Sequence, residues 1–348
     1  LYAGEAAPGL PASPTILWPI ASISKAFSAA AVMRLVELGV LTVNTPVHRL
    51  LPAFRGDGRE EIRLRHLLTH TSGLPYESPE MVARLAARTP LAALTDEAFT
   101  APLRFRPGTR FSYSDYAFLI AARMAETATG DPFPELVRRL VLEPMGLRDT
   151  FLLPDAAAQA RIARVRDVQA EGTAGEMYNS AYARSLAHPA FSVVSSAPDM
   201  LRFLRHFVPG GPRIHAEATV RAMTSVQTGE VPGDFILLGG LGAEARIPWS
   251  YVFELQTPQA PAILSELASF SAFGHPGASG CHLLADPVAD LEIVILTNAH
   301  LHAGLEDWFR GQQQLLAAAF LEGERPDRAA DPERRDRGGG RAAAHPPG

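Results

Sequence analysis

Apolar residues recur at helical spacing along the chain as far as about residue 229 and at strand spacing beyond it. The clearest helical run follows Pro19 and stops at Gly39, which predicts a helix over about 23–39, because proline interrupts regular structure and glycine commonly ends a helix. The same spacing predicts further helices, which are expected over about 60–69, 78–99, 117–129, 133–142, 198–207, 215–224 and 304–321.

The chain beyond Gly229 carries short runs of β-branched and aromatic residues bounded by turn residues, as strands do. Strands are therefore expected over 235–238, 251–255, 271–275, 280–285 and 291–296. Residues 286–290 should be the turn of an antiparallel hairpin between the last two strands. Residues 1–4 resemble the end of one more strand.

Length and composition place these elements in one large domain or in two closely packed ones. The 348 residues, 47% of them hydrophobic, suffice for a core of native size. We expect a sheet region from 1–45 and 190–322 and a mostly helical region from 46–189. The apolar period is lost after residue 322, which predicts a disordered tail over 323–348.

Charge and cysteine content exclude several function classes. A net charge of −5 gives no electrostatic reason to expect nucleic acid as a partner. Cys281 is the single cysteine, which excludes an internal disulfide and a zinc site built from several thiolates. No apolar run reaches the roughly 18 residues of a membrane span. Because the chain begins at Leu1 rather than methionine, we expect a truncated N-terminus, and neither compartment nor oligomeric state is predicted.

Ser22-Ile23-Ser24-Lys25 stands where the first long helix begins. Residues three apart lie on one helical face, so the Ser22 hydroxyl and the Lys25 amine should point the same way. Lys25 is the only lysine among the 32 lysines and arginines. Guanidinium stays charged, whereas a desolvated amine can lose its proton and act as a base toward a serine nucleophile. Chance is the competing explanation, because Ser-x-x-Lys is a short pattern.

Tyr113-Ser114-Asp115 falls in a loop between a Pro-Gly turn and a helix, where a side chain can be presented to a ligand. A phenol whose pKa is lowered by a neighbouring lysine would serve as a general base. The alternative is ordinary packing of one of the seven tyrosines.

His275-Pro276-Gly277-Ala278 ends a predicted strand beside the hairpin. Glycine at this position permits a ligand to approach the backbone closely. The Ala278 amide could donate a hydrogen bond to an oxyanion. The alternative for His275 is a capping or surface imidazole, since the chain has 11 histidines.

In this order the three motifs resemble those of serine hydrolases with the β-lactamase and penicillin-binding-protein fold. The closest resemblance is to the group of class C β-lactamases, D-aminopeptidases and esterases. Ser22-x-x-Lys25 is similar to the nucleophile motif, Tyr113-Ser114-Asp115 to the Tyr-x-Asn motif, and the stretch beginning at His275 to the Lys/His-x-Gly motif. The sequence over 66–75 is similar to a structural segment of the same family, and the resemblance covers roughly 15–322.

The resemblance implies an α+β fold, an α/β/α sandwich around an antiparallel sheet with an inserted, mostly helical region. It implies that Ser22 is the acylated nucleophile and that Lys25 and Tyr113 share the proton transfer, either of them being the acylation base. The backbone amides of Ser22 and Ala278 would form the oxyanion hole. Substrate contacts are expected from Asp115, His275 and Gly277, with Asp115 alternatively contacting Lys25. No cofactor and no metal are expected.

Two positions depart from the family pattern. His275 stands where β-lactamases usually carry lysine, and imidazole is largely neutral at pH 7, so a fixed cation for a substrate carboxylate is missing. Asp115 replaces the more frequent asparagine. Its carboxylate should keep Lys25 charged, which would make the amine a poorer base and shift the burden to Tyr113.

We therefore expect a serine hydrolase that acts on a small ester or amide, with carboxylesterase ahead of β-lactamase and D-amino-acid peptidase or carboxypeptidase. A non-catalytic ligand-binding or scaffold protein on the same fold is the alternative from another class. Weaker candidates are a thiol nucleophile at Cys281, which is more often a buried apolar residue, and a metal site at His300-x-His302, which lacks a third ligand. No Gly-x-Ser-x-Gly motif is present, which argues against an α/β-hydrolase.

Overall fold

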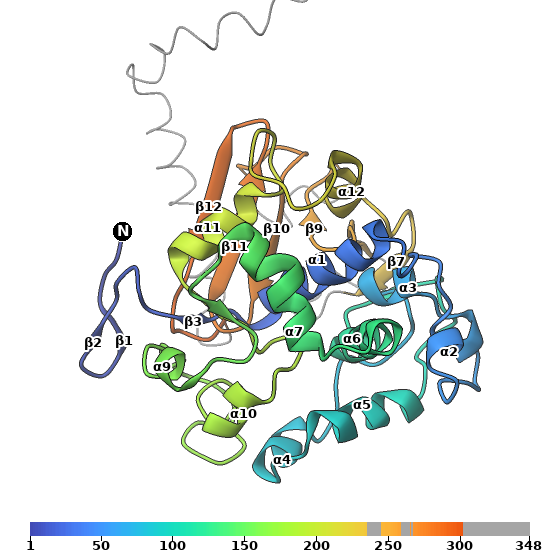
Figure 1. Cartoon of the computed structure of the whole chain (residues 1–348), viewed down its shortest axis with the longest axis horizontal. Coiled ribbons are helices and arrows are strands. Elements are labelled where there is room, and N and C mark those ends of the chain that lie inside the picture. Colours follow the sequence, from blue (N-terminus) through green and yellow to red (C-terminus); the bar gives the residue numbers. More distant parts are fainter. Residues whose placement is uncertain (235–244, 259–264, 266, 302–348) are drawn as a thin grey trace, which may run out of the picture.

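A four-stranded antiparallel sheet forms the centre of the protein, whose computed structural model describes residues 1–234, 245–258, 265 and 267–301. The strand order is β12-β11-β10-β9 (Figure 1), with bounds Leu291–Ile295, Cys281–Asp286, Phe273–Gly277 and Glu254–Leu255. The β10–β11 register runs from Phe273 opposite Ala285 to Gly277 opposite Cys281. The hairpin of β11 and β12, joined through residues 287–290, is as predicted.

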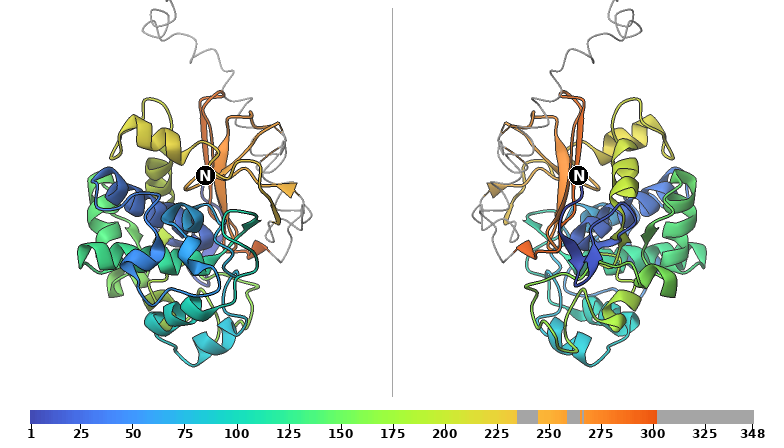
Figure 2. Two further views of the ribbon diagram at one scale, coloured as in Figure 1. Left: turned by 90° about the vertical axis from the view of Figure 1, so that its right-hand side faces the viewer. Right: turned by 90° about the vertical axis from the view of Figure 1, so that its left-hand side faces the viewer.

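Two helices, α1 (Ser24–Glu37) and α11 (Ala197–Arg205), lie on one side of this sheet, which Figure 2 shows edge-on. The α1 sequence is apolar almost all round, as expected of a helix buried in the middle of a protein. The rings of Phe27 and Phe203 stack at 3.9 Å between the two helices. Helix α1 ends just before Gly39, whose φ of +76° is a conformation that favours glycine.

The helical region packs around α6 (Asp115–Thr129), which is buried along most of its length. Ser114 caps its first turn by accepting a hydrogen bond from the Ala117 amide at 3.1 Å, and Gly130 ends it with a φ of +83°. The other described helices are α2 (Val47–Leu50), α3 (Leu64–Leu68), α4 (Met81–Ala86), α5 (Leu91–Thr100), α7 (Phe133–Val137), α8 (Glu143–Met145), α9 (Ala156–Gln159), α10 (Ala181–Ser185) and α12 (Glu217–Met223).

Three small sheets complete the described structure. β1 (Glu5–Ala7) pairs with β2 (Leu10–Pro11), and β3 (Trp18–Pro19) and β5 (Thr150–Phe151) flank β6 (Val194–Ser195), all antiparallel. The pair of β4 (Phe111–Ser112) and β7 (Pro232–Asp234) is parallel, and β8 (Ala245–Arg246) joins β7 antiparallel.

Most predicted elements are confirmed, and the differences have local causes. Residues 1–4 precede β1 instead of forming a strand. The expected strand over 251–255 shortens to β9 because the Ser250 hydroxyl accepts hydrogen bonds from the Val252 and Phe253 amides, which makes a turn there. The expected strand over 271–275 begins two residues later, after a turn in which the Ala272 amide donates to Ser269.

Two predicted helices are interrupted. The helix expected over 78–99 is two helices, because Arg88 has a φ of +52° and Pro90 precedes α5. The helix expected over 133–142 continues beyond α7 only as a π-helical turn, Arg138–Leu142. The strand over 235–238, the helix over 304–321 and the tail over 323–348 lie outside the described residues.

One continuous apolar cluster joins α1, α6 and α11 to β10 and β11. The division into a sheet region and a helical region remains a prediction. No helix among the described residues combines the length and the apolar character that crossing a bilayer requires.

Candidate active site

Ser22 lies in a short 3-10 helix, Ala21–Ile23, that leads directly into α1. Ala21 has a φ of +47°, the left-handed region that costs a residue with a side chain about 1 kcal/mol. The turn is held from outside, because the Ile20 amide donates to the Val193 carbonyl at 3.1 Å. Ser22 is therefore presented from a constrained turn and is 3% exposed.

Lys25 is buried one turn further along, with three acceptors around its amine. Its Nζ lies 3.3 Å from Ser22 Oγ, 3.2 Å from the Ala190 carbonyl oxygen and 2.6 Å from Asp115 Oδ1. Three acceptors match the three N–H donors of an ammonium group. The expected pairing of Ser22 with Lys25 is confirmed as geometry, and Asp115 contacts the amine.

Tyr113 lies between β4 and α6, and the 66–75 segment holds it there. The ring of His70 stacks on the Tyr113 ring with 4.3 Å between centroids, and His70 Nδ1 accepts a hydrogen bond from the Ser114 amide at 3.1 Å. Ser114 Oγ donates to the Pro75 carbonyl at 2.6 Å, and the Asp115 amide donates to the Tyr76 carbonyl at 2.7 Å. The segment that resembles a structural element of the family thus positions the second motif.

The hydroxyl of Tyr113 meets groups from the other two motifs. It lies 3.5 Å from His275 Nε2 and is hydrogen-bonded by Ser22. His275 Nδ1 lies 2.7 Å from the Pro276 carbonyl, which can only accept, so this nitrogen carries the imidazole proton. Nε2 is then an acceptor, and the Tyr113 hydroxyl donates to it. The structure therefore brings the residues of all three motifs together.

Gly277 places the end of β10 against the turn that carries Ser22. A Cβ atom on Gly277 would lie 2.3 Å from the Ile20 carbonyl oxygen. The protein's own backbone thus makes a close approach at this glycine, and the substrate contact expected at Gly277 stays a prediction. Among the described residues, neither the Ser22 nor the Ala278 amide donates to a protein acceptor, so both donors are available.

The pKa directions differ from two expectations and agree with a third. Burial and the Asp115 charge raise the pKa of Tyr113 well above its usual value, so its pKa is not lowered by Lys25. Burial lowers the pKa of Lys25 more than the Asp115 charge raises it. The expectation that Asp115 keeps Lys25 charged is therefore not met. Burial and the neighbouring Lys25 lower the pKa of His275 to about 3, which agrees with a neutral imidazole.

A cavity of about 550 Å³ opens beside these residues, and Ala278 forms part of its wall. Ala278 packs with Ala21, the neighbour of Ser22, in a small cluster that also includes Val168 and Tyr178. We call this space the catalytic-side cavity; much of its lining is apolar and comes from Met81, Val82, Leu85, Val168 and Met177.

Glu77 also lines the catalytic-side cavity, although no motif in the sequence pointed to it. Its Oε2 atom is buried without a hydrogen-bond partner. Burial and the Asp115 charge raise its pKa to about 8, against a smaller opposing effect of Lys25. A single acidic residue outside any motif looks like a surface residue in sequence, because its burial depends on the loops that close over it.

The described residues give no support to the weaker sequence candidates. Cys281 is fully buried, and burial raises the pKa of its thiol to about 11, which suits an apolar residue better than a nucleophile. The described residues contain no cluster of metal-binding side chains, and His302 lies outside them.

Comparison with known proteins agrees with this geometry. A family model described as Beta-lactamase matches residues 1–316. Esterase EstB from Burkholderia gladioli is 29% identical over 323 residues, covering 83% of this chain and 79% of the esterase. A putative D-alanyl-D-alanine carboxypeptidase from Salmonella typhi is 25% identical and covers 82% of this chain and 70% of its own.

Solved structures share the fold. A family VIII carboxylesterase, 23% identical, superposes with a TM-score of 0.69 and covers 85% of this chain and 82% of its own. A penicillin-binding-protein homologue from Caulobacter crescentus, 20% identical, gives a TM-score of 0.66 over 86% and 82% of the two chains. With the family model spanning nearly the whole described chain, the protein belongs to the beta-lactamase family of hydrolases.

Proposed function

We propose that the protein is a serine hydrolase that cleaves a small carboxylic ester through an acyl-enzyme on Ser22. The observation that carries the proposal is the Ser22 hydroxyl, which contacts both the Lys25 amine and the Tyr113 phenol. Acyl transfer needs these parts: an activated hydroxyl, a group that takes its proton and returns it to the leaving group, and fixed donors for the oxyanion.

Two groups touch the Ser22 hydroxyl and compete for its proton. Lys25 must first be neutral, and burial shifts its pKa in that direction. Tyr113 must first lose its own proton, but burial and the Asp115 charge raise its pKa, which makes that loss harder. Both directions favour Lys25 as the acceptor, while Tyr113 orients the Ser22 hydroxyl.

An ester substrate is favoured over a penicillin for two reasons. A neutral His275 supplies no fixed cation for the substrate carboxylate that β-lactamases and carboxypeptidases bind. The apolar wall of the catalytic-side cavity suits an acyl group of moderate size. The similarity to an esterase at 29% identity supports the same choice.

Labelling with a fluorophosphonate tests the proposal directly. Intact-protein mass spectrometry should show one adduct on the native protein and none on Ser22→Ala. Ser28→Ala is the matched control, since Ser28 lies on the same helix with its hydroxyl bonded to the Pro189 carbonyl at 2.6 Å; this variant should label like the native protein. Failure of the native protein to label, or to cleave any activated ester, would favour a non-catalytic protein on this fold.

A second candidate, hydrolysis of amino-acid esters or amides, is favoured by Glu77. Its unpartnered carboxylate oxygen in the catalytic-side cavity could accept a hydrogen bond from a substrate ammonium group. Such a contact would be charge-assisted on both sides and would satisfy the buried oxygen.

Alanine methyl ester and methyl isobutyrate have the same shape and differ only in the ammonium group, so they isolate this contact. Glu77→Gln should lower kcat/KM for the alanine ester about tenfold and leave the isobutyrate unchanged. Because the Glu77 pKa is about 8 and the amine of the ester loses its proton near the same pH, the native preference for the alanine ester should be greatest near pH 8 and fall on either side. Equal effects of the variant on both esters would reject the second candidate and leave the serine hydrolase intact.

A further inference from the structure

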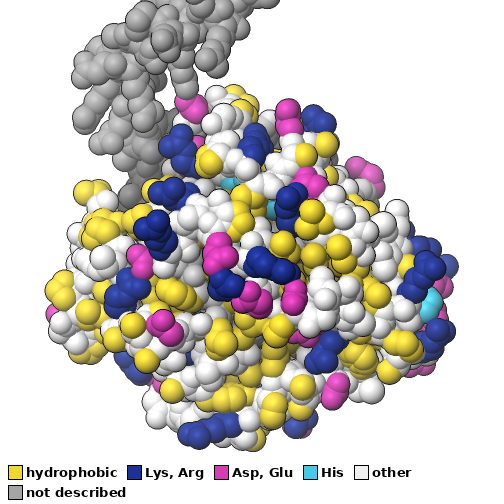
Figure 3. Space-filling model, in the orientation of Figure 1, with side chains coloured by type: hydrophobic (Ala, Val, Ile, Leu, Met, Phe, Trp, Pro, Cys, Tyr) yellow, Lys and Arg dark blue, Asp and Glu magenta, His cyan; other side chains and the backbone are white. Residues whose placement is uncertain are grey.

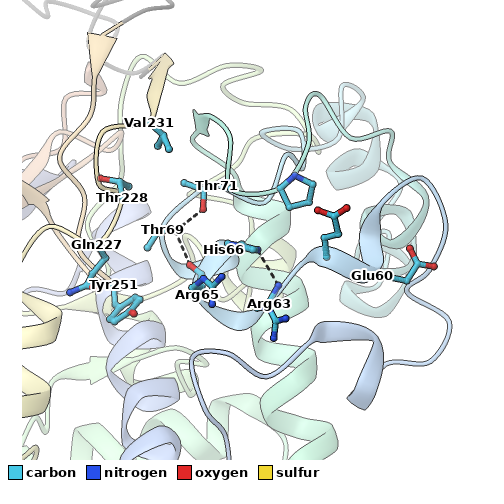
Figure 4. Close-up of a pocket in the computed structure, with 13 residues that line it drawn as sticks. Glu60, Arg63, Arg65, His66, Thr69, Thr71, Gln227, Thr228, Val231 and Tyr251 are labelled. Carbon is cyan, nitrogen blue, oxygen red and sulfur yellow. Dashed lines mark hydrogen bonds between the residues drawn. The ribbon is translucent and has the colours of Figure 1, made fainter.

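A second cavity, of about 540 Å³, lies beside α3 and shares no lining residue with the catalytic-side cavity. Figure 4 shows its polar lining, drawn from α3, the segment that follows it and the chain on either side of β7 and β8. We call it the arginine cavity after Arg63 and Arg65, the two cationic residues that line it.

Neither arginine is paired with a carboxylate in the described part of the chain. Arg63 Nη1 donates to the Asn44 carbonyl at 2.9 Å, and Arg65 Nη1 donates to Asn44 Oδ1. Both side chains are half-buried. A guanidinium carries five N–H donors, so most of the hydrogen-bonding capacity of each remains unused.

Charged side chains elsewhere on the surface are mixed, and some of them form ion pairs. Figure 3 shows basic and acidic side chains interspersed on one face of the molecule. Arginines pair with nearby carboxylates in several places, for example Arg138 with Glu135 and Arg161 with Asp149. Other arginines, such as Arg205, also lack an ion pair within the described residues, so what distinguishes the arginine cavity is that two such cations line one cavity.

The two glutamates of the lining are engaged elsewhere. Glu61 forms an ion pair with Arg106 at 2.9 Å. Glu60 Oε1 accepts a hydrogen bond from the Gly56 amide at 2.9 Å, and Figure 4 shows its side chain at the edge of the cavity, away from Arg65. Neither carboxylate is close enough to Arg63 or Arg65 to form an ion pair.

Among the neutral groups that line the cavity, the Tyr251 hydroxyl is a further donor. Thr69 Oγ1 donates to the Arg65 carbonyl at 2.7 Å, so Thr71 Oγ1, 2.9 Å away, donates to Thr69. The hydroxyl of Tyr251 makes no hydrogen bond within the described residues. Tyr251 and Arg65 line the same cavity; burial raises the pKa of Tyr251, and the Arg65 charge opposes this rise.

We propose that the arginine cavity binds a small oxyanion, a phosphate ester or a polycarboxylate, through Arg63, Arg65 and Tyr251. Arg63, Arg65 and Tyr251 all offer unused donors, two of them cationic, and oxyanions are the ligands that accept from several such donors at once. The cavity volume accommodates a small organic molecule that carries the anionic group.

The arginine cavity is separated from the candidate active site by an aromatic wall. Thr71 follows His70, whose ring stacks on Tyr113, and Thr228 Oγ1 accepts a hydrogen bond from the amide of Trp249, whose ring meets Tyr113 edge-on at 5.7 Å. A ligand in the cavity would lie behind this wall, so the proposal is independent of the hydrolase activity.

Isothermal titration of the full chain with sodium pyrophosphate, and separately with citrate, tests the proposal. Sodium chloride keeps the ionic strength constant, because a change in salt concentration by itself alters the interactions of surface charges. Saturable binding of at least one of the two anions is expected, and Arg65→Gln should weaken it about tenfold or more, because charge-assisted hydrogen bonds are lost. Arg205→Gln, at an exposed arginine on α11, should bind like the native protein.

Tyr251→Phe is a second test in case Arg65→Gln fails to fold, because it removes only the hydroxyl. It should weaken binding several-fold and leave the unfolding temperature nearly unchanged. Tighter binding of pyrophosphate would identify a phosphate ester as the ligand class, and tighter binding of citrate a polycarboxylate. No saturable binding of either anion, or equal weakening by Arg65→Gln and Arg205→Gln, would overturn the proposal.

Discussion

Lys25→Met is expected to abolish turnover and to lower the free energy of unfolding by about 3–5 kcal/mol, the cost of leaving one partner of a buried ion pair alone. The Asp115 carboxylate would then be buried without the ammonium that lies 2.6 Å away in the native protein. The loss of proton transfer at Ser22 should slow acylation by about 10²–10⁴-fold. Chemical unfolding followed by circular dichroism and fluorophosphonate labelling measure the two losses separately.

The pH dependence and a double variant separate these effects. Without Lys25, burial holds the Asp115 pKa above its unfolded value, so the folded variant retains a proton that the unfolded chain loses. Its stability should therefore be highest at acidic pH and fall as pH rises from about 4 through the folded pKa.

Lys25→Met/Asp115→Asn removes the buried charge and should recover most of the stability at pH 7, but none of the activity. A double variant as unstable as the single one would contradict the ion-pair account.

Gly277→Ala is expected to reduce the acylation rate by about 10²–10³-fold, as the loss of one oxyanion donor does in other acyl-transfer enzymes. The added Cβ would lie 2.3 Å from the Ile20 carbonyl oxygen, which is backbone and cannot rotate away. The end of β10 must therefore move off the turn that carries Ser22, and the Ala278 amide moves with it. Overpacking of this kind also costs about 1–3 kcal/mol of stability.

Steady-state hydrolysis of a p-nitrophenyl ester and thermal unfolding check this result. Ala278→Gly is the control, because it adds no atom and keeps both backbone amides in place; its activity should stay close to that of the native protein. Native kcat in Gly277→Ala would show that the position of the Ala278 amide does not matter to the reaction.

The sequence predicted the helices around the site well, because their signals are local. Pro19 and Gly39 bracket α1, and Ser114 and Gly130 bracket α6. The three-residue spacing of Ser22 and Lys25 placed both side chains on one face, and the hydrogen bond between them follows from helix geometry. Motif order joined these residues to Tyr113 and His275, although they lie far apart in the chain.

Other features of the site could not be predicted from the sequence, because they depend on burial and on contacts between residues far apart in the chain. The pKa of Tyr113 was expected to fall beside Lys25, but full burial raises it, and burial cannot be read from the residues around it. The sequence also does not reveal that the Ile20 carbonyl packs against Gly277, because the two residues are far apart in the chain. The cavities arise where loops distant in sequence meet, so neither Glu77 nor Arg65 stood out before the fold was known.

The isolation of Lys25 also determines how the protein responds to amine-specific reagents. The chain has no other lysine, and this one is 1% exposed with its amine surrounded by acceptors. Amine-reactive dyes and crosslinkers that are too bulky to enter the candidate active site can modify this lysine only in molecules in which the core around α1 has opened. The yield of a single lysine adduct over time therefore reports the opening of the region that holds Ser22, without any engineered probe.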